Sequence, residues 1–245
     1  MSDRLAVVTG AASGIGAATA RRLAGDGATV LACDVADAAG DAVAHDLGGT
    51  YVHVDVGDPG AWADLARRLA GRRVEWAVLN AGVLTAADPT PFLDVPVERL
   101  ARVRAVNLDG VLLGVRALAP LIAASGGGAI VATASLAGLG PYADDPVYAA
   151  TKHAVVGFVR SVAPQLDARG VRLHAICPGG VDTGLLDAER KARIAAAGRP
   201  MLAPEEVADA VAALLTSDET GVIATIVAGR GAQPYAFRGV PGPRA

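Results

Sequence analysis

Short runs of β-branched and apolar residues alternate along this chain with longer segments of helical spacing. Several runs are apolar at every position, which is typical of strands that are covered on both faces. Strand–helix alternation of this kind predicts a doubly wound parallel sheet with helices on both faces. The sheet is expected to have about seven strands, at Leu5–Val8, Thr29–Cys33, Tyr51–Val54, Trp76–Leu79, Ala129–Ala132, Arg172–Cys177 and Val222–Val227.

Three of the intervening segments carry clear helix signals. Apolar residues step by three or four positions from Leu100 to Leu121, and again from Tyr148 to Leu166. Pro204, followed by two glutamates, suits the first turn of a late helix, because proline tolerates that position and acids favour the helix dipole.

Composition narrows the class of protein. The chain has 245 residues, of which 52% are hydrophobic and 19% charged, and its net charge is −3. A core of that apolar content excludes a disordered chain, and the lack of basic excess argues against nucleic-acid binding. No apolar run reaches the roughly 18 residues that a membrane span needs. We expect a single domain over residues 1–231 and an irregular tail over 232–245, which either frays or folds over a cleft or partner.

The cysteine content indicates a compartment. Cys33 and Cys177 are the only two cysteines, so the chain is not a disulfide scaffold. The sequence therefore predicts a protein of a reducing, cytoplasmic compartment, with both thiols serving as small core residues.

A glycine-rich turn follows the first expected strand and opens a helix. Glycines at such a turn let a diphosphate approach the backbone, and the helix N-terminus supplies free N–H groups and partial positive charge. A glycine turn alone could be simple strand–helix punctuation, but its place after the first strand is the context that a dinucleotide site requires. The residues expected to hold the diphosphate are Gly10, Ser13, Gly14, Ile15 and Gly16.

Asp34 ends the second strand, about 20 residues further on, where a dinucleotide fingerprint places an acidic residue. Its carboxylate can accept hydrogen bonds from both adenosine ribose hydroxyls, whereas a 2′-phosphate would meet a like charge. At ~4 Å and an effective dielectric near 20 that repulsion is about 4 kcal/mol. Val35 and Ala36 follow, with no cation to offset the charge, so the sequence favours NAD over NADP. The alternative reading of Asp34 is a turn or helix-capping residue.

Further polar or small residues follow the next two strands. Asp55 and Val56 are expected beside the adenine, and Asn80, Ala81 and Gly82 leave room beside the cofactor. Each often merely caps a turn. All of them follow carboxyl ends of strands, where open α/β sheets bind ligands.

Tyr148 and Lys152 lie four residues apart in an expected helix, so their side chains share one face. A tyrosine pKa near 10 is too high for a base at neutral pH, but a cation at ~4 Å could lower it by up to about three units. Lys152 is also long enough to reach ribose hydroxyls.

Ser135 and Asn107 complete the candidate catalytic residues. Ser135 follows the fifth strand, where its hydroxyl can bond a substrate oxygen. Asn107 interrupts an apolar helix face, and because an unsatisfied buried amide costs about 1–3 kcal/mol, it is expected to have a task such as holding a water beside Lys152. A turn serine and a satisfied core asparagine are the plainer readings.

These motifs resemble the classical short-chain dehydrogenase/reductase family over nearly the whole chain. The resemblance rests on Thr9–Gly16, Asp55, Asn80–Gly82, Asn107, Ser135, the Tyr148/Lys152 pair, and Pro178-Gly179 with Thr183. It implies a Rossmann-type fold in which Tyr148 is the acid/base, Lys152 tunes it and binds the nicotinamide ribose, Ser135 positions the substrate, and Asn107 holds a relay water. It also implies cofactor contacts from Pro178, Val181 and Thr183.

A closer resemblance is to the NAD-linked hydroxyprostaglandin dehydrogenase branch, through Ser135–Leu139 and Tyr148–Thr183. That branch usually has a substrate-contacting glutamine where this chain has Asp145. A carboxylate there would repel an anionic substrate, so prostaglandins themselves are not expected. The chain also departs from the family ending at Ala228–Gly231, which affects the expected subunit contacts.

No metal site is expected, because the four histidines, His45, His53, His153 and His174, lack ligand spacing. The segment between Thr183 and Leu202 resembles a substrate-covering loop or short helix. Its charge run, Glu189–Lys191, otherwise suits a solvated face.

The sequence therefore predicts an NAD-dependent oxidoreductase for a secondary alcohol or ketone that is apolar or lipid-like, of hydroxysteroid or hydroxy fatty acid type. The alternatives are an NADPH-dependent 3-oxoacyl-type ketoreductase and a non-catalytic dinucleotide-binding regulator. The family resemblance implies a homodimer or homotetramer. The expected substrate pocket is lined by Leu136, Leu139, Tyr142, Leu185 and Leu186.

Overall fold

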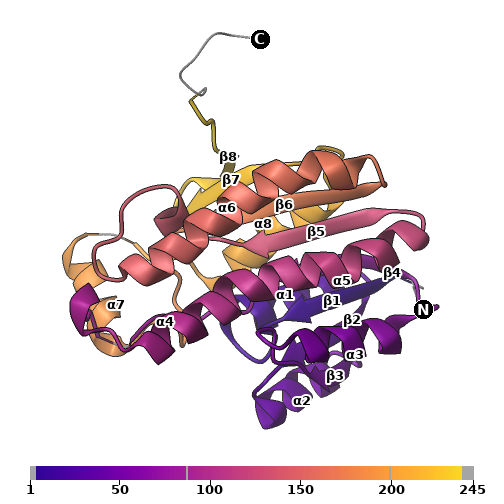
Figure 1. The fold of residues 1–245 in the computed structure, drawn as a ribbon, viewed down its shortest axis with the longest axis horizontal. Helices are drawn as coiled ribbons and strands as arrows, with labels where there is room; N and C mark the ends of the chain where they lie inside the picture. Colours follow the sequence, from indigo (N-terminus) through magenta and orange to yellow (C-terminus); the bar gives the residue numbers. More distant parts are fainter. Residues whose placement is uncertain (1–3, 87, 199, 239–245) are drawn as a thin grey trace.

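A computed structural model describes residues 4–86, 88–198 and 200–238. Eight strands form one sheet in the order β3-β2-β1-β4-β5-β6-β7-β8 (Figure 1). The first seven are parallel and the last is antiparallel. The strands are β1 (Leu5–Thr9), β2 (Thr29–Asp34), β3 (Thr50–His53), β4 (Val74–Leu79), β5 (Gly128–Thr133), β6 (Val171–Pro178), β7 (Ile223–Val227) and β8 (Gly231–Pro234).

Eight α-helices lie between these strands in the described ranges. Two of them, α4 and α5, are joined by a π-helical turn, Ala105–Asp109. The helices are α1 (Gly14–Gly25), α2 (Asp37–Asp46), α3 (Pro59–Leu69), α4 (Val97–Arg104), α5 (Gly110–Ala124), α6 (Pro146–Asp167), α7 (Ala188–Ala196) and α8 (Pro204–Thr216). The predicted doubly wound α/β class is confirmed, and every expected strand is present within two residues at its ends.

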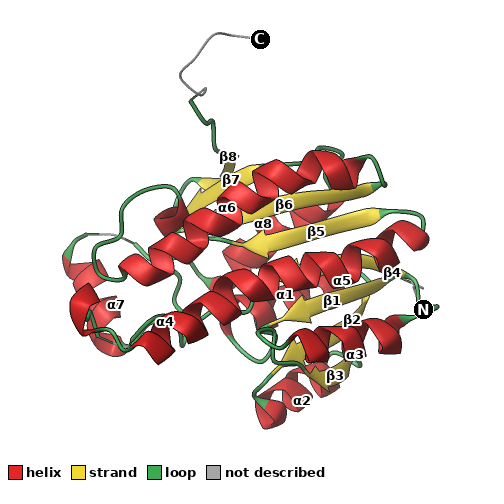
Figure 2. Cartoon of the chain, in the orientation of Figure 1, coloured by secondary structure: helices red, strands yellow, loops and turns green. Residues whose placement is uncertain are grey.

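Successive residues of the central strands point to opposite faces and pack in two cores. Leu5 and Val7 of β1 belong to the core under α3, α5 and α6, whereas Ala6 and Val8 belong to the core under α1, α2 and α8. Because both faces are covered, every residue of β1 is buried, which explains its continuously apolar sequence. Figure 2 shows α5 and α6, two helices of the first of these layers, in front of the sheet.

The chain reverses its direction of travel across the sheet between β1 and β4. It adds β2 and β3 on one side of β1, then returns to place β4 on the other. The two connections leave β1 and β4 in opposite directions, and such a switch point opens a crevice at the carboxyl ends of the strands. In Figure 2 the arrowheads of β1 and β5 point toward the end of the molecule where α7 lies.

The α4–α5 unit forms one long apolar helix. At 28 residues, Val97–Ala124 is the one helix among the described residues long and apolar enough to cross a membrane, by length and composition alone. Its residues Val111, Leu118 and Ile122 are buried against the sheet, which is the packing of a core helix.

The C-terminal segment differs from the expected irregular tail over 232–245. Residues 232–234 belong to β8, which pairs with β7 along the sheet edge. Beyond it, the rings of Tyr235 and Phe237 meet edge to face, and the Arg160 guanidinium lies 3.7 Å from the Phe237 ring centre. Residues 239–245 of the expected tail lie outside the described residues.

Candidate active site

A cleft of about 1670 Å³ opens at the carboxyl ends of the strands. Its walls come from the segments that follow β1 to β6, together with α7. Pockets for a single small ligand usually measure about 300–1,000 Å³, so this cleft has room for a dinucleotide and a second small molecule.

The glycine turn after β1 has the geometry that the sequence predicted. Gly10 and Gly14 have positive φ angles of 64° and 52°, a region that L side chains rarely adopt. A Cβ on Gly16 would stand 1.9 Å from the Gly10 carbonyl oxygen, so only glycine fits there. Ser13 begins α1 without a side-chain cap, which leaves the first N–H groups of the helix available to an anion.

Asp34 lies at the same end of the cleft and ties the turn to β2. Its Oδ1 accepts hydrogen bonds from the N–H groups of Val35 (2.7 Å) and Ala36 (3.0 Å), and its Oδ2 accepts from Ala12 N–H (2.9 Å). About four acceptor positions exist on a carboxylate. The structure therefore leaves Oδ2 room for one ribose hydroxyl, rather than the two that the sequence suggested.

The Asn80 side chain links two strand ends by hydrogen bonds inside the expected cofactor site. Its Nδ2 donates to the carbonyls of Thr9 (3.3 Å) and Gly10 (3.4 Å), and its Oδ1 accepts from the Thr133 hydroxyl (3.2 Å). The side chain thus joins the ends of β1 and β5 across β4. The neighbouring residues, Ala81 and Gly82, line the cleft as expected.

The adenine end of the expected site is more open. Asp55 is exposed, and its Oδ1 accepts the Gly57 N–H at 2.9 Å, which is a turn-forming bond. Val56 is buried, and both residues line the cleft.

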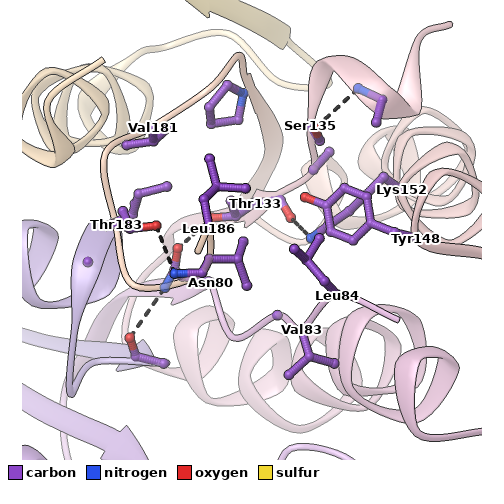
Figure 3. A pocket seen from close by; sticks show the side chains of 18 of the residues that line it. Asn80, Val83, Leu84, Thr133, Ser135, Tyr148, Lys152, Val181, Thr183 and Leu186 are labelled. Atoms are coloured by element: carbon purple, nitrogen blue, oxygen red, sulfur yellow. Dashed lines mark hydrogen bonds between the residues drawn. The ribbon is translucent and has the colours of Figure 1, made fainter. Parts of the chain in front are cut away.

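Tyr148 and Lys152 project into the cleft from α6, as Figure 3 shows. The Lys152 ammonium lies 5.5 Å from the centre of the Tyr148 ring. Lys152 is 2% exposed, and its Nζ donates to the Thr133 carbonyl at 2.7 Å. An ammonium has three donors, so two remain for ribose hydroxyls or water.

The acid–base properties of this pair differ from the sequence-based expectation. Burial raises the pKa of Tyr148 to about 12, while the neighbouring Ser135 hydroxyl acts to lower it. Burial also lowers the pKa of Lys152 to about 8. The lowering of the Tyr148 pKa that we expected from Lys152 is therefore not found in the protein alone, where desolvation of the phenolate has the largest effect.

Ser135 faces the same space as Tyr148 (Figure 3). Its Oγ accepts the Ala137 N–H at 3.1 Å, at the start of a short 3₁₀ turn, Leu136–Gly138. The hydroxyl accepts that bond, and its own proton can be donated to an oxygen in the cleft, either that of Tyr148 or that of a substrate.

Asn107 lies fully buried in the π-helical turn between α4 and α5. Its amide exchanges two hydrogen bonds with the backbone of Val83, from Val83 N–H to Oδ1 at 2.8 Å and from Nδ2 to the Val83 carbonyl at 2.9 Å. Nδ2 also donates to the Thr151 hydroxyl at 3.3 Å. The amide is therefore satisfied by protein groups, so the desolvation argument for a bound water does not hold, and the relay water stays a prediction.

Asp145 does not contact the substrate space, contrary to the expectation that it would repel an anionic substrate. It is 2% exposed and does not line the cleft. Its Oδ1 accepts the Thr85 hydroxyl (2.6 Å) and the Tyr148 N–H (3.0 Å), and its Oδ2 accepts the Thr85 N–H (2.9 Å). The carboxylate caps α6 and ties it to the segment after β4.

The segment after β6 packs against the glycine turn. Thr183 approaches Gly14 so closely that a Cβ there would lie 3.0 Å from Thr183 Cγ2. Thr183 Oγ1 accepts the Leu185 N–H at 3.3 Å. Pro178, Val181 and Thr183, the expected nicotinamide contacts, all line the cleft.

The apolar part of the cleft contains four of its five predicted residues, which are Leu136, Tyr142, Leu185 and Leu186. The fifth, Leu139, packs against the core under α6 instead.

Arg190 is a cleft residue that sequence reasoning missed. The Glu189–Lys191 charge run suggested a solvated face, yet Arg190 is 3% exposed and lines the cleft. Ile194, one turn further along α7, lines it too, and this four-residue spacing was the only available sign.

The remaining titratable groups show no metal centre within the described ranges. His53 Nδ1 lies 2.7 Å from the Asp37 carboxylate at the surface, and His174 is buried in β6. Both thiols are buried, and burial raises the pKa of Cys33 to about 12 and that of Cys177 to about 11.

Sequence comparisons place these features in a known family. A family model described as short chain dehydrogenase matches residues 4–194. A cis-4-hydroxycyclohexanecarboxylate dehydrogenase from Sinomonas cyclohexanicum is 40% identical, covering 93% of this chain and 95% of its own. A 3-alpha-(or 20-beta)-hydroxysteroid dehydrogenase from Mycobacterium tuberculosis is 37% identical, covering 76% of this chain and 74% of its own.

Solved structures give a consistent result. A 3-ketoacyl-(acyl-carrier-protein) reductase from Brucella melitensis, complexed with NADH, superposes with a TM-score of 0.83 at 28% identity and covers 93% of this chain and 98% of its own. A putative NAD(P)-dependent gluconate 5-dehydrogenase from Beutenbergia cavernae, with bound NADP, has a TM-score of 0.80 at 36% identity, covering 91% and 94%.

Proposed function

Because this chain belongs to the short-chain dehydrogenase/reductase family, we propose that it is an NAD-dependent oxidoreductase of apolar secondary alcohols and their ketones. The observation that carries the proposal is a juxtaposition in one cleft. Tyr148, Ser135 and Lys152 lie beside the glycine turn that suits a diphosphate, at the switch point of the sheet.

The residues present fit a nicotinamide dinucleotide. No Ser13 side chain caps the first N–H groups of α1, so they can bind the diphosphate. Lys152 keeps two donors for the nicotinamide ribose. Bound there, the nicotinamide ring supplies the acceptor for a hydride from the carbinol carbon. Val181 and Thr183 would hold its carboxamide end.

The protein residues handle the proton. In alcohol oxidation the Tyr148 phenolate takes the proton of the substrate hydroxyl, and in ketone reduction the neutral phenol returns it. Ser135 donates its hydroxyl hydrogen bond to the substrate oxygen and thereby orients it. The Lys152 cation stabilises the phenolate that forms, which matters because burial alone disfavours that anion.

The choice of NAD rests on Asp34. It is a half-buried carboxylate at the ribose end of the cleft, and the two residues after it carry no charge. A 2′-phosphate at ~4 Å would be disfavoured by about 4 kcal/mol, or roughly a thousandfold in affinity. Among the solved relatives one holds NADH and another NADP, and the titration below distinguishes the two cofactors.

The substrate class rests on the cleft wall. Leu136, Leu185 and Leu186 give that wall an apolar surface suited to a ring or acyl chain rather than a sugar. Similarity to dehydrogenases named for hydroxysteroids and for a hydroxycyclohexanecarboxylate supports this class. The hydroxyprostaglandin dehydrogenase-like branch stays a prediction from sequence, on which this proposal does not depend.

The test is a matched binding titration of NAD+, NADP+, NADH and NADPH on the wild type, Asp34→Asn and Asp34→Ala. The wild type should prefer NAD(H), and both variants should lose at least tenfold of that preference because the charge is gone. Asp41→Ala, which removes an exposed acid outside the cleft, is the matched control and should leave the ratio unchanged.

The preference ratio is the readout, because Asp34 also holds the Ala12 N–H and its loss can weaken binding of all four nucleotides. Preference of the wild type for NADP(H) would contradict the cofactor assignment and favour a reductive role. Binding without turnover of any secondary alcohol or ketone would favour a regulator that has kept the fold.

A further inference from the structure

A buried cation that has no hydrogen-bond or ion-pair partner among the described residues lies in the wall of the cleft. Arg190 is 3% exposed, and neither its Nε nor its Nη1 has a hydrogen-bond partner within the described structure. A buried charge is costly unless it is paired and hydrogen-bonded. The proposed proton and hydride chemistry does not use Arg190, so its place requires another explanation.

The other cations described in α7 form ion pairs, unlike Arg190. Lys191 pairs with Asp182 at 2.7 Å, and Arg193 pairs with Glu189 at 3.4 Å. Within the described part of α7, Arg190 is therefore the cation that is both buried and unpaired. The Asp187 side chain caps the helix by accepting the Arg190 N–H at 2.7 Å, which fixes where the Arg190 side chain begins.

Arg190 lies on the substrate side of the cleft. Its charge acts on Tyr142, whose pKa is raised by burial and lowered in part by Arg190. The Tyr142 ring is in turn 6.4 Å from the Tyr148 ring, edge to face. Tyr142 thus links the proposed proton-transfer residue to the region of the buried cation, and apolar residues of the wall, Leu186 and Ile194, line the same space.

The acids nearest to Arg190 do not neutralise it. Arg190, Asp144 and Asp145 line one small side pocket, but neither acid forms an ion pair with Arg190. Both Asp145 oxygens are engaged by Thr85 and Tyr148, and Asp144 is exposed to solvent. The carboxylate that would have repelled an anionic substrate is therefore turned away from the substrate space.

We propose that Arg190 binds a carboxylate of the substrate, so that the enzyme acts on a hydroxy acid or keto acid with an apolar body rather than on a neutral alcohol such as a sterol. A guanidinium presents a planar fork of donors that matches a carboxylate, and burial strengthens the pair. This inference rests on the proposed function, because it names the substrate class of the same cleft.

The test compares two substrates that differ only in charge, 4-hydroxycyclohexanecarboxylate and 4-hydroxycyclohexanecarboxamide, each as cis and trans isomers. The wild type should prefer the acid. Arg190→Gln should lower the acid-to-amide ratio of kcat/KM about tenfold to hundredfold, mainly through KM for the acid, and leave the amide nearly unchanged.

Two further variants make the ratio interpretable. Lys191→Gln removes a cation from the same helix that does not line the cleft, and it should leave the ratio unchanged. Arg190→Lys keeps the charge but loses the fork, and it should give an intermediate ratio. Since Arg190→Gln removes an unpaired buried charge, it should not lower the melting temperature of the ligand-free protein.

A readout without turnover separates this inference from the proposed function. Cyclohexanecarboxylate, which has no hydroxyl group, should raise the melting temperature of the NADH-loaded wild type but not that of Arg190→Gln. Equal acid-to-amide ratios in the wild type and Arg190→Gln would overturn the carboxylate site even if the amide is oxidised. If no alcohol is oxidised but the stabilisation still depends on Arg190, the carboxylate site stands and the proposed oxidoreductase activity is wrong.

Discussion

At the scale of single residues, three buried nitrogen-bearing side chains differ in what compensates their burial. Lys152 gives one hydrogen bond to Thr133 and keeps two donors toward the cleft. Arg190 also faces the cleft, where a ligand can pair it. His174 is fully buried in β6 away from the cleft, and neither ring nitrogen has a partner in the described structure. His174 therefore affects stability rather than chemistry.

His174 should make the protein sensitive to acid. Burial and the nearby Arg172 lower its pKa from 6.5 to about 4. As pH falls from 6.5 toward 4, the unfolded chain binds the proton first, so up to about 3 kcal/mol of unfolding free energy is lost. His174→Leu should remove that loss. Because it also deletes two unpartnered nitrogens, it should raise the unfolding free energy at pH 7.5 by about 1 kcal/mol.

Urea unfolding at pH 7.5 and pH 4.5 measures both effects. His45→Gln is the matched control, because it removes a histidine whose side chain is 92% exposed and leaves the core unchanged. An acid dependence that is the same in the wild type and His174→Leu would contradict the assignment.

At the scale of elements, two side-chain clips hold the segment after β4 against the helices that carry the site. Asn107, in the π-helical turn, exchanges two hydrogen bonds with Val83, and Asp145 joins Thr85 to the first turn of α6. A π turn inside a helix is uncommon and often marks a functional site. Here it brings Asn107 to Val83, so the position of Tyr148 depends on this segment as well as on α6.

Asp145→Ala should therefore both destabilise the protein and slow the reaction. Loss of the cap and of the partner of the buried Thr85 N–H should lower the unfolding free energy by about 2–4 kcal/mol. Loosening of the first turn of α6 should misplace Tyr148 and reduce kcat more than the affinity for NAD+. Chemical unfolding, steady-state kinetics and nucleotide titration measure these three quantities.

Asp144→Ala is the control, since the adjacent Asp144 is exposed and accepts none of these bonds. Equal effects of the two substitutions on the unfolding free energy would show that Asp145 does not clip the two segments together.

At the scale of the whole molecule, cofactor binding should stabilise the fold, because the cleft draws residues from both sides of the switch point. At a concentration of 100 times Kd, NAD+ should raise the unfolding free energy by about 2.7 kcal/mol. For a chain of this size that corresponds to a rise in Tm of roughly 5–11 °C. NADP+ at the same concentration should give a much smaller rise.

Two glycines of α1 provide matched variants for this measurement. Gly16→Ala should abolish the rise, because a Cβ there would collide with the Gly10 carbonyl at 1.9 Å. Gly25→Ala places a methyl group in open space at the other end of the helix, so it should keep the full rise. A full rise in Gly16→Ala would place the nucleotide elsewhere.

Much of this architecture follows from local sequence. Alternation of buried strands and helices is a short-range pattern, so the order of elements and the doubly wound class were predictable. The glycine turn, Asp34, and the Tyr148/Lys152 pair were predictable for the same reason, since each depends on spacing within one or two adjacent elements. The short β8 was missed because all four of its residues are exposed, so the hairpin that it forms with β7 has no buried apolar run to indicate a strand.

The surroundings of the reactive groups were decided by residues far apart in the chain. Asp145 seemed to face the substrate until the fold brought Thr85 to it, 60 residues away. Arg190 seemed solvated within its charge run until α7 folded over the cleft. The pKa of Tyr148 is raised rather than lowered because tertiary burial disfavours the phenolate. Periodicity and spacing therefore determined which residues share an element, whereas only packing decided their solvation and hydrogen-bond partners, because both depend on what the rest of the chain places around them.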